Sequence, residues 1–301
     1  MDNFFLEGEA KDLGYINVRD LSHHENARQF IAYLWRRYKK FADPHFREDA
    51  KNHFLERFWE MYLTVTLIDR GLRVQRVSHE GPEFYIKQNN KRIWVEAIAP
   101  GPGVGADRVP EPQNGIAYKV PTEKILLRFT HALVEKRNKY RDALEKGIIA
   151  PEDGYLLAIN CRAIPHAPYG NTLPYFVQAY LPFGPYAVSI DPNTGNIVDS
   201  FYQYRGTISK LNGADVPTRA FLDPGYSFVS AVLNSSVDCV NHPKEVGGDF
   251  CLLHNPNAAK CIDQTLFNWC QQMALVGDEL VTSQPNQSHN LNAAKDAAPT
   301  G

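Results

Sequence analysis

One stretch, residues 81–98, constrains the fold more than any other part of the chain. Read with the two-residue period of a strand, Phe84 and Ile86 share one face, and Ile93 and Val95 share one face further on. The polar segment 88–91 between them is typical of a turn, so the stretch is predicted to form a β-hairpin. Its second strand is apolar except for Glu96, and such a run is typical of a buried central strand.

Two carboxylates in this hairpin suggest a site. An unpaired carboxylate at Glu96 would be costly inside an apolar strand, so Glu96 needs a partner. If Glu83 and Glu96 face the same side of neighbouring strands, they form a carboxylate pair. Hard cations such as Mg²⁺ select oxygen ligands of this kind. The hairpin therefore predicts a metal site as well as a fold.

Composition limits the classes of protein that the chain can belong to. A chain of 301 residues with 44% hydrophobic content can bury a sizeable core, as one large domain or two modest ones. The formal net charge of −2 gives no global basic signature, so any nucleic-acid contact would need a local basic patch.

Targeting signals and cysteine usage are the next constraint. The first seven residues lack the basic and apolar regions of a secretory signal, and no uncharged apolar run approaches the roughly 20 residues that span a bilayer. Five cysteines without paired spacing suit a reducing compartment. We therefore expect a soluble cytoplasmic protein that does not enter a membrane.

Three helices are predicted in the first half of the chain. The first covers residues 24–41 and carries a basic cluster at 36–40, which either contacts phosphates or is a solvated helix face. The second opens with Asp43 as N-cap and runs to Gly71. Glu60 is the one charge in its apolar second half, where it either pairs with an arginine or belongs to a functional site.

The third predicted helix runs from Thr122 to Gly147. Lys136 and Arg137 flank its apolar stripe, so these side chains either extend along apolar surface to solvent or reach around the edge of the sheet. A buried strand is predicted at 155–161. The long Gly/Pro-rich segment 100–120 between hairpin and helix favours a functional loop, although it contains no P-loop motif.

The order of these elements predicts an α/β (α+β) fold, with a mixed central sheet flanked by helices. The later half is strand-rich, with a hairpin at 186–198, strands at 228–233 and 250–253, and a last helix at about 263–275. We predict four regions: an N-terminal helical segment (1–42), an α/β core (43–162), a β-rich extension packed on the core (163–281) and a disordered tail (282–301).

With Glu60, Gly81-Pro82-Glu83 and Trp94-Val95-Glu96-Ala97 in this order, residues 45–160 resemble the PD-(D/E)XK nuclease superfamily, which has a restriction-endonuclease-like core. The resemblance implies hydrolysis of nucleic-acid phosphodiester bonds with Mg²⁺ or Mn²⁺. It makes Glu83 and Glu96 metal ligands and the carbonyl of Ala97 a third ligand. Glu60 would be a carboxylate outside the direct ligands of the metal.

The chain departs from the pattern of that superfamily at two positions. Glu83 stands where the pattern usually has Asp, and Ile98 stands at the position of the lysine that helps to activate water. Either Lys87, on the face of Glu83, or Lys136, from the following helix, would have to supply the missing charge, and we favour Lys136. Lys136 or Arg137 would then orient the phosphate. The alternative is a catalytically inactive nuclease-like scaffold that binds nucleic acid or a protein partner.

Two other kinds of site were weighed. The spacing of Cys239 with His242, and of Cys251 with His254, is that of zinc ligands, but residues three apart on a strand point to opposite faces. Core cysteines and a turn histidine are the favoured interpretation. A nucleophilic hydrolase is disfavoured because the sequence contains no Gly-x-Ser-x-Gly elbow.

Overall fold

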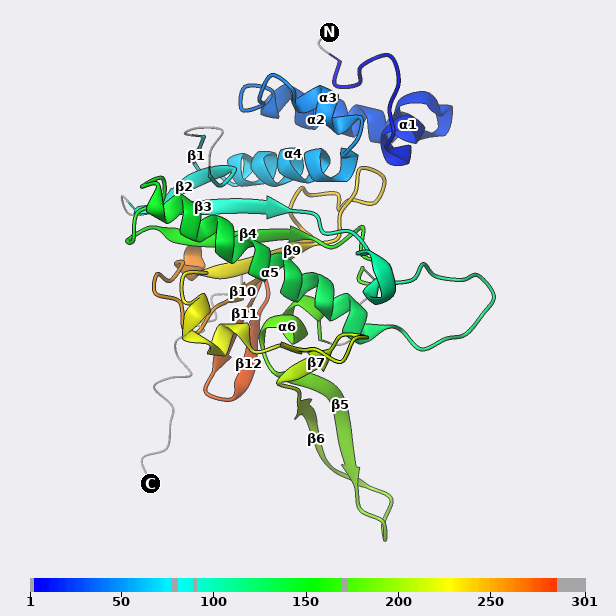
Figure 1. Ribbon diagram of the computed structural model, residues 1–301, viewed down its shortest axis with the longest axis vertical. Coiled ribbons are helices and arrows are strands. Elements are labelled where there is room, and N and C mark those ends of the chain that lie inside the picture. Colours follow the sequence, from blue (N-terminus) through cyan, green and yellow to red (C-terminus); the bar gives the residue numbers. More distant parts are fainter. Residues whose placement is uncertain (1–2, 77–80, 89–90, 169–172, 286–301) are drawn as a thin grey trace.

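The computed structural model describes residues 3–76, 81–88, 91–168 and 173–285, which form a sheet with helices on both faces (Figure 1). The α-helices are α1 (Leu13–Asp20), α2 (Glu25–Tyr38), α3 (Phe46–Ala50), α4 (Phe54–Asp69), α5 (Thr122–Glu145) and α6 (Tyr175–Tyr180). The 3₁₀ turns are η1 (Ser22–His24), η2 (Gly105–Asp107), η3 (Ala220–Leu222), η4 (Pro224–Tyr226) and η5 (Gln264–Phe267). Within the described ranges, no helix has the length and apolar character that a bilayer crossing requires.

The strands are β1 (Val74–Gln75), β2 (Phe84–Gln88), β3 (Lys91–Ile98), β4 (Gly154–Asn160), β5 (Phe183–Ile190), β6 (Ile197–Tyr204), β7 (Thr207–Ser209), β8 (Asp215–Pro217), β9 (Ala231–Ser235), β10 (Cys251–His254), β11 (Gln271–Val276) and β12 (Glu279–Ser283). Eight of them form one sheet in the order β1-β2-β3-β4-β9-β10-β11-β12. Strands β1 to β3 are antiparallel, and β3, β4 and β9 are parallel. The predicted α/β class with a mixed sheet between helices is confirmed.

The hairpin of β2 and β3 has the predicted faces. Phe84 lies opposite Val95 and Ile86 opposite Ile93, and all four side chains belong to the core on the α4 side of the sheet. Trp94 points to the other face and joins the core beneath α5. The turn residues Asn89 and Asn90 lie outside the described residues. A two-residue period read from the sequence therefore gives the correct side of the sheet for each side chain.

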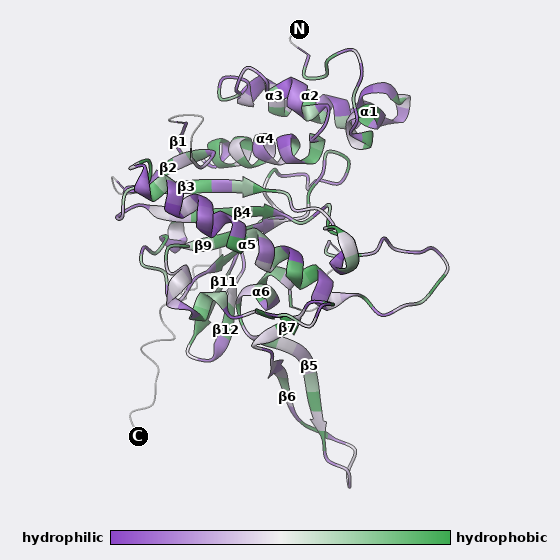
Figure 2. Ribbon diagram, viewed as in Figure 1, coloured by the Kyte–Doolittle hydropathy of each residue, from purple (hydrophilic) through white to green (hydrophobic). Residues whose placement is uncertain are grey.

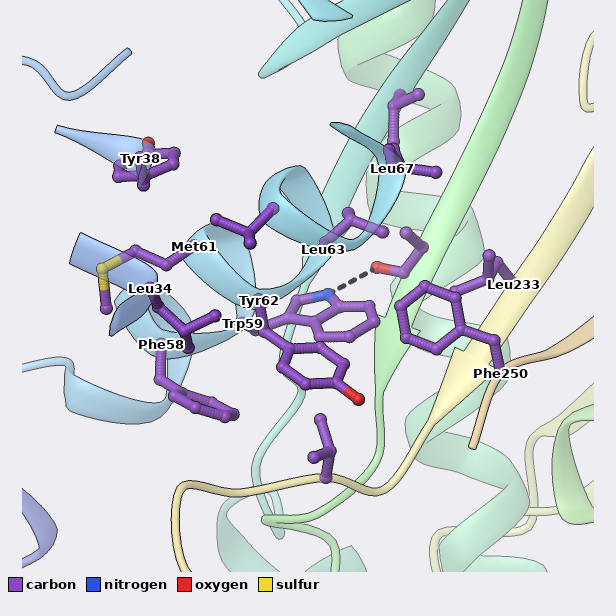
Figure 3. Close-up of a cluster of buried hydrophobic side chains, with 14 of the residues drawn as sticks. Leu34, Tyr38, Phe58, Trp59, Met61, Tyr62, Leu63, Leu67, Leu233 and Phe250 are labelled. Atoms are coloured by element: carbon purple, nitrogen blue, oxygen red, sulfur yellow. Dashed lines mark hydrogen bonds between the residues drawn. The ribbon is translucent and has the colours of Figure 1, made fainter. Parts of the chain in front are cut away.

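Helix α4 is buried nearly all round because it packs between the sheet and the other N-terminal helices. From Phe58 to Leu67 every residue of the helix is buried. Trp59 anchors the helix to the sheet, since its indole Nε1 donates a hydrogen bond to the backbone carbonyl of Ala158 on β4 at 3.1 Å (Figure 3). A helix held this firmly can position a carboxylate precisely enough for a site.

Helix α5 covers the opposite face of the sheet. The predicted range 122–147 contains the whole helix, which carries hydrophobic and hydrophilic segments in alternation (Figure 2). Leu126, Phe129 and Leu133 are buried on the face toward the sheet. Tyr140 packs against Tyr155 of β4, with ring centroids 5.2 Å apart. Helices α4 and α5 thus lie on opposite faces of the same strands.

The prediction of one helix over residues 43–71 is wrong, because the chain forms α3 and α4 with a break at Lys51 to His53. The carbonyl of Lys51 accepts hydrogen bonds from the backbone N–H groups of Lys11 and Asp12, at 3.0 and 2.9 Å. The Asp12 carboxylate in turn accepts the N–H of Phe54 at 3.0 Å. Contacts with residues 40 positions away, rather than a local breaker, end one helix and begin the next.

The predicted helix at 263–275 is also wrong. After the single turn η5, residues of β11 pair in parallel with β10 and antiparallel with β12. Gly277, with φ of 60°, makes the turn between β11 and β12. Thr282 and Ser283, predicted as tail, belong to β12, while residues 286–301 lie outside the described residues.

The second half of the chain continues the sheet of the first half. Strand β9 begins at Ala231, within the predicted strand 228–233, and pairs in parallel with β4 across the proposed boundary at residue 162. The predicted hairpin at 186–198 is present and longer, as β5 and β6, and it extends away from the sheet (Figure 1). The division into a core and an extension remains a prediction.

Candidate functional site

A polar pocket of ≈ 390 Å³ lies between α4, the end of β3 and α5. Of the predicted site residues, Glu60, Glu83, Ala97 and Lys136 line it. Glu96 lies next to this pocket and lines a smaller neighbouring cavity of ≈ 250 Å³. The predicted residues therefore lie in one region around the end of β3, and they come from α4, the start of β2, β3 itself and α5.

Glu60 projects from α4 into the pocket and is held by three side chains. The Tyr38 hydroxyl donates a hydrogen bond to its Oε1, Arg57 Nη1 donates to its Oε2 at 2.9 Å, and Arg76 Nη1 approaches Oε1 at 3.5 Å. Burial, followed by the nearby Glu60 charge, raises the pKa of Tyr38, so this hydroxyl stays protonated and donates. Glu60 is thus a neutralised carboxylate, and the arginine pairing considered from the sequence is present at the wall of a pocket.

Glu96 and Lys136 form a buried ion pair. Lys136 Nζ of α5 lies 2.5 Å from Glu96 Oε1, and only 6% of each side chain is exposed. Burial by itself would lower the pKa of Lys136, but the charge and hydrogen bond of Glu96 raise it above its ordinary value. Lys136 is therefore a cation at neutral pH and cannot accept a proton there. Its ammonium supplies positive charge beside Glu96.

Glu83 is the third carboxylate and differs from the other two. It directly precedes β2, and the register of Phe84 with Val95, continued by one residue, places it opposite Glu96. Within the described part of the chain it makes no hydrogen bond or ion pair. Burial and then the charges of Glu60 and Glu96 raise its pKa to about 8. Near neutral pH the Glu83 carboxyl is therefore mostly protonated, unless a cation takes the place of the proton.

The structure distinguishes the candidate lysines and arginines. Lys87 is exposed on β2 and lies opposite Arg92, away from the pocket, whereas Lys136 lines the pocket. Arg137 lies on the other side of α5, with its guanidinium 5.0 Å from the ring centroid of Tyr226, so it does not face these carboxylates. Ile98 lines the pocket as an apolar wall. Of the two lysines predicted from the sequence, Lys136 is the one that lies among the acidic residues.

Several residues around the site were missed from the sequence. Arg57 stands three positions before Glu60, a helical spacing that could have indicated the pair. Tyr38 and Arg76 reach Glu60 only through the packing of α2 and β1 against α4, and no local pattern signals that contact. Arg128, His131 and Lys139 of α5 add basic groups to the pocket. The predicted basic cluster at 36–40 lies elsewhere, where Arg37 pairs with Asp69.

The residues considered for metal binding do not gather into a dense cluster. Among the described residues, no group of three or more His, Cys, Asp or Glu side chains is arranged to hold a metal ion. Cys251 is buried in the core, and His254 Nε2 lies 2.8 Å from Gln272 Oε1, in agreement with the structural interpretation of this pair. Any cation at the carboxylate site would have to use Glu83 and Glu96, completed by backbone oxygen and water.

Comparisons with known proteins give no relative: the chain matches no family model, no curated protein and no solved structure.

Proposed function

We propose that the chain is a metal-dependent nuclease that hydrolyses phosphodiester bonds, with a site like that of the PD-(D/E)XK superfamily. The observation that carries the proposal is the meeting of Glu60, Glu83, Glu96 and Lys136 at the end of β3. The order of elements supports it, because helix α4, the antiparallel strands β1 to β3, helix α5 and the parallel strand β4 follow one another in the chain. Glu60 lies on α4, Glu83 directly precedes β2 and Glu96 lies on β3, and this order supports the proposal.

The raised pKa of the Glu83 carboxyl supports a divalent cation as the cofactor. A carboxyl with a pKa near 8 is stabilised by a proton or by a metal ion, and Mg²⁺ and Mn²⁺ prefer carboxylate oxygens. Glu96 Oε1 is occupied by Lys136, which leaves its second oxygen for a cation shared with Glu83. The carbonyl of Ala97 remains the proposed third ligand, since Ala97 lines the pocket.

The chemistry divides among the residues of the pocket. A bound divalent cation would supply positive charge against the phosphate and would activate water for attack. Lys136, a cation in this environment, would stabilise the negative charge that develops on the phosphate, and Arg128 and Lys139 would orient the substrate at the mouth of the pocket. Glu60 would hold Arg57 and Arg76 in place. A nucleic-acid partner and a location in the cytoplasm are parts of the same proposal, and five unpaired cysteines are compatible with them.

A second candidate is an inactive scaffold that binds nucleic acid or protein. The contact between Lys136 and Glu96 favours it, because an internal cation already neutralises one proposed metal ligand. Ile98, an apolar residue at the usual lysine position, favours it as well.

Cleavage assays on single- and double-stranded DNA and RNA, with Mg²⁺, Mn²⁺ or EDTA, test the proposal. We expect cleavage that requires the metal, and a loss of at least about 100-fold in the Glu96→Ala and Glu83→Gln variants. Glu145→Ala, at the exposed end of α5, is the matched control and should retain full activity.

Folding must be checked in the same variants, because removal of Glu96 leaves Lys136 buried without its partner, and such a loss costs about 3–5 kcal/mol. The double variant Glu96→Gln/Lys136→Met removes both charges and should recover much of that stability while remaining inactive. Undiminished cleavage by the double variant would exclude this pair from the mechanism. Absence of metal-dependent cleavage in the wild type, together with nucleic-acid binding, would establish the scaffold instead.

A further inference from the structure

A second and larger pocket, of ≈ 690 Å³, lies on the other side of α5, where α6 and the turns η3 and η4 approach the helix. Residues 130, 133, 134 and 137 of α5 line it, whereas residues 128, 131, 132, 135, 136 and 139 line the carboxylate pocket. At 100° per residue these two sets are centred on opposite faces of the helix, so the helix, about 10–12 Å wide, separates the two pockets. The second pocket is thus an independent site.

Aromatic and aliphatic side chains form the floor of this pocket. Tyr180 is fully buried, donates its hydroxyl to the backbone carbonyl of Phe129 at 3.0 Å, and stacks on Phe221. Tyr180 therefore supports the pocket from beneath, and the accessible apolar lining comes from Tyr204, Leu222 and Val134. Leu133 is buried and Val134 is partly exposed beside it. Such a floor favours a flat, apolar group in a cavity whose volume is typical of sites for small organic molecules.

The polar groups of the pocket are mainly cationic. Arg137 lies over the Tyr226 ring, and its Nε is buried without a hydrogen-bond partner. Arg219 is exposed at the rim, and within the described ranges neither arginine forms an ion pair. Asp223 is the one acidic residue among those lining the pocket, and its carboxylate already accepts the N–H of Gly225 at 2.8 Å. Since neither arginine is paired with a described acidic residue, an anionic ligand would supply the missing partner for their charges.

We propose that this pocket binds a nucleotide, with the base on the aromatic floor and the phosphate between Arg137 and Arg219. Inorganic phosphate alone would leave the apolar lining uncovered, and an uncharged ring would leave the charges of Arg137 and Arg219 unpaired. A nucleoside phosphate answers both requirements, because arginine binds phosphate through two parallel hydrogen bonds. The nucleotide can be a free monophosphate or the 5′-phosphorylated end of a nucleic-acid strand. The inference holds whether or not the carboxylate site cleaves nucleic acid.

Isothermal titration calorimetry of the full chain with AMP, UMP, adenosine and inorganic phosphate tests the proposal. We expect both nucleotides to bind at least 10-fold more tightly than adenosine or phosphate. Arg137→Met and Arg219→Met should each weaken AMP binding at least 10-fold, and Arg141→Met, on the same helix but outside the pocket lining, should leave it unchanged. A 5′-phosphorylated oligonucleotide that displaces AMP, when its 5′-hydroxyl counterpart does not, would identify a strand end as the ligand; failure to displace would identify the free nucleotide.

The proposal is overturned if AMP does not bind at concentrations up to about 5 mM, or if the Arg137→Met/Arg219→Met double variant binds it as well as wild type. Thermal unfolding of each variant checks the fold. If Arg137→Met does not fold, Arg137→Lys decides, because lysine keeps the charge and loses the two-pronged contact. Glu96→Gln should bind AMP normally, so failure of the nuclease proposal and failure of this one give different results.

Discussion

At the scale of single residues, Glu83 differs from its acidic neighbours because no described side chain neutralises it. Glu60 is held by Arg57 and Arg76, and Glu96 is held by Lys136. Glu83 is buried near the charges of Glu60 and Glu96, which raise its pKa. The charges of Arg76 and Lys136 lower that pKa and offset the increase only in part. One carboxyl of the three therefore carries the electrostatic cost of assembling the site.

This cost predicts a pH dependence of stability. The pKa of Glu83 is raised from 4.5 to about 8, so the folded state holds the proton more tightly than the unfolded state does. Its contribution to stability is fully present below pH 4.5 and is lost as the pH rises toward 8. In EDTA, Glu83→Gln should gain stability relative to wild type between pH 5 and pH 8.5, by about 4 kcal/mol, measured by urea unfolding at both pH values.

Glu135→Gln, an exposed change at the same pocket, is the control and should show no such pH-dependent gain. If instead the stability difference between Glu83→Gln and wild type is the same at pH 5 and pH 8.5, Glu83 ionises with an ordinary pKa. Added Mg²⁺ should stabilise wild type more at pH 8.5 than at pH 5, because a cation and a proton compete for the same carboxylate.

The sequence allowed the placing of some site residues and not of others. Glu96 was recognisable because a charge inside an apolar strand requires a partner, and Lys136 because it flanks the apolar stripe of a helix. Tyr38 and Arg76 were not recognisable, since they reach Glu60 through packing between segments that are distant in sequence. Local period predicts which way a side chain points, but it does not predict which distant side chain will meet it.

At the scale of elements, one aspartate organises the start of two helices. Asp12 Oδ1 accepts the N–H of Tyr15 at the start of α1, and Asp12 Oδ2 accepts the N–H of Phe54 at the start of α4. Since α4 carries Glu60, this carboxylate also fixes where the helix of the site begins. The contact with Tyr15 is a local N-cap of α1, whereas the contact with Phe54 spans 42 positions and has no local signal in the sequence.

We therefore expect Asp12→Ala to lose two caps together. Each N-cap contributes about 1 kcal/mol, so the free energy of unfolding should fall by about 2 kcal/mol, measured by urea denaturation. Asp12→Asn, which keeps one acceptor oxygen, should fall between wild type and Asp12→Ala. The control is Asp20→Ala, at an exposed position that pairs only with Arg19, where a loss below about 0.5 kcal/mol is expected. Equal losses at both positions would refute the double cap.

Elements with a clear period and local end signals were predictable. The hairpin of β2 and β3, the helix α5 and the hairpin of β5 and β6 are of this kind. The break between α3 and α4 depends on residues 11 and 12, which the local sequence does not contain. Residues 263–275 were misassigned because a short apolar segment fits a helix or a strand, and pairing with β10 decided between them.

At the scale of the whole molecule, the candidate site lies in a sheet that both halves of the chain build. Every residue of β4 is buried, and this strand pairs with β3 on one side and with β9 on the other. Beneath α5, residues of α6 and β9 complete the core. Residues 45–160 therefore rely on later residues for much of their burial.

This dependence predicts that a fragment of residues 1–162 does not fold cooperatively. Without β9, the backbone groups on one edge of β4 lose their partners, and the core under α5 is open. Near-ultraviolet circular dichroism should show little fixed aromatic packing, and thermal unfolding should be broad. A chain of residues 1–285, which keeps every described strand, is the comparison and should unfold sharply. A sharp transition in the short fragment would make residues 1–162 an autonomous folding unit.

The pairing of β4 with β9 has a consequence for synthesis on the ribosome. About 70 residues separate the end of β4 from the start of β9. At about 5–20 residues per second, the apolar strand waits roughly 4–14 s before its neighbour has been made. During that interval the nascent chain exposes the apolar side chains and the unpaired edge of β4 to the cell. Exposed segments of this kind are bound by chaperones until the rest of the fold has been synthesised.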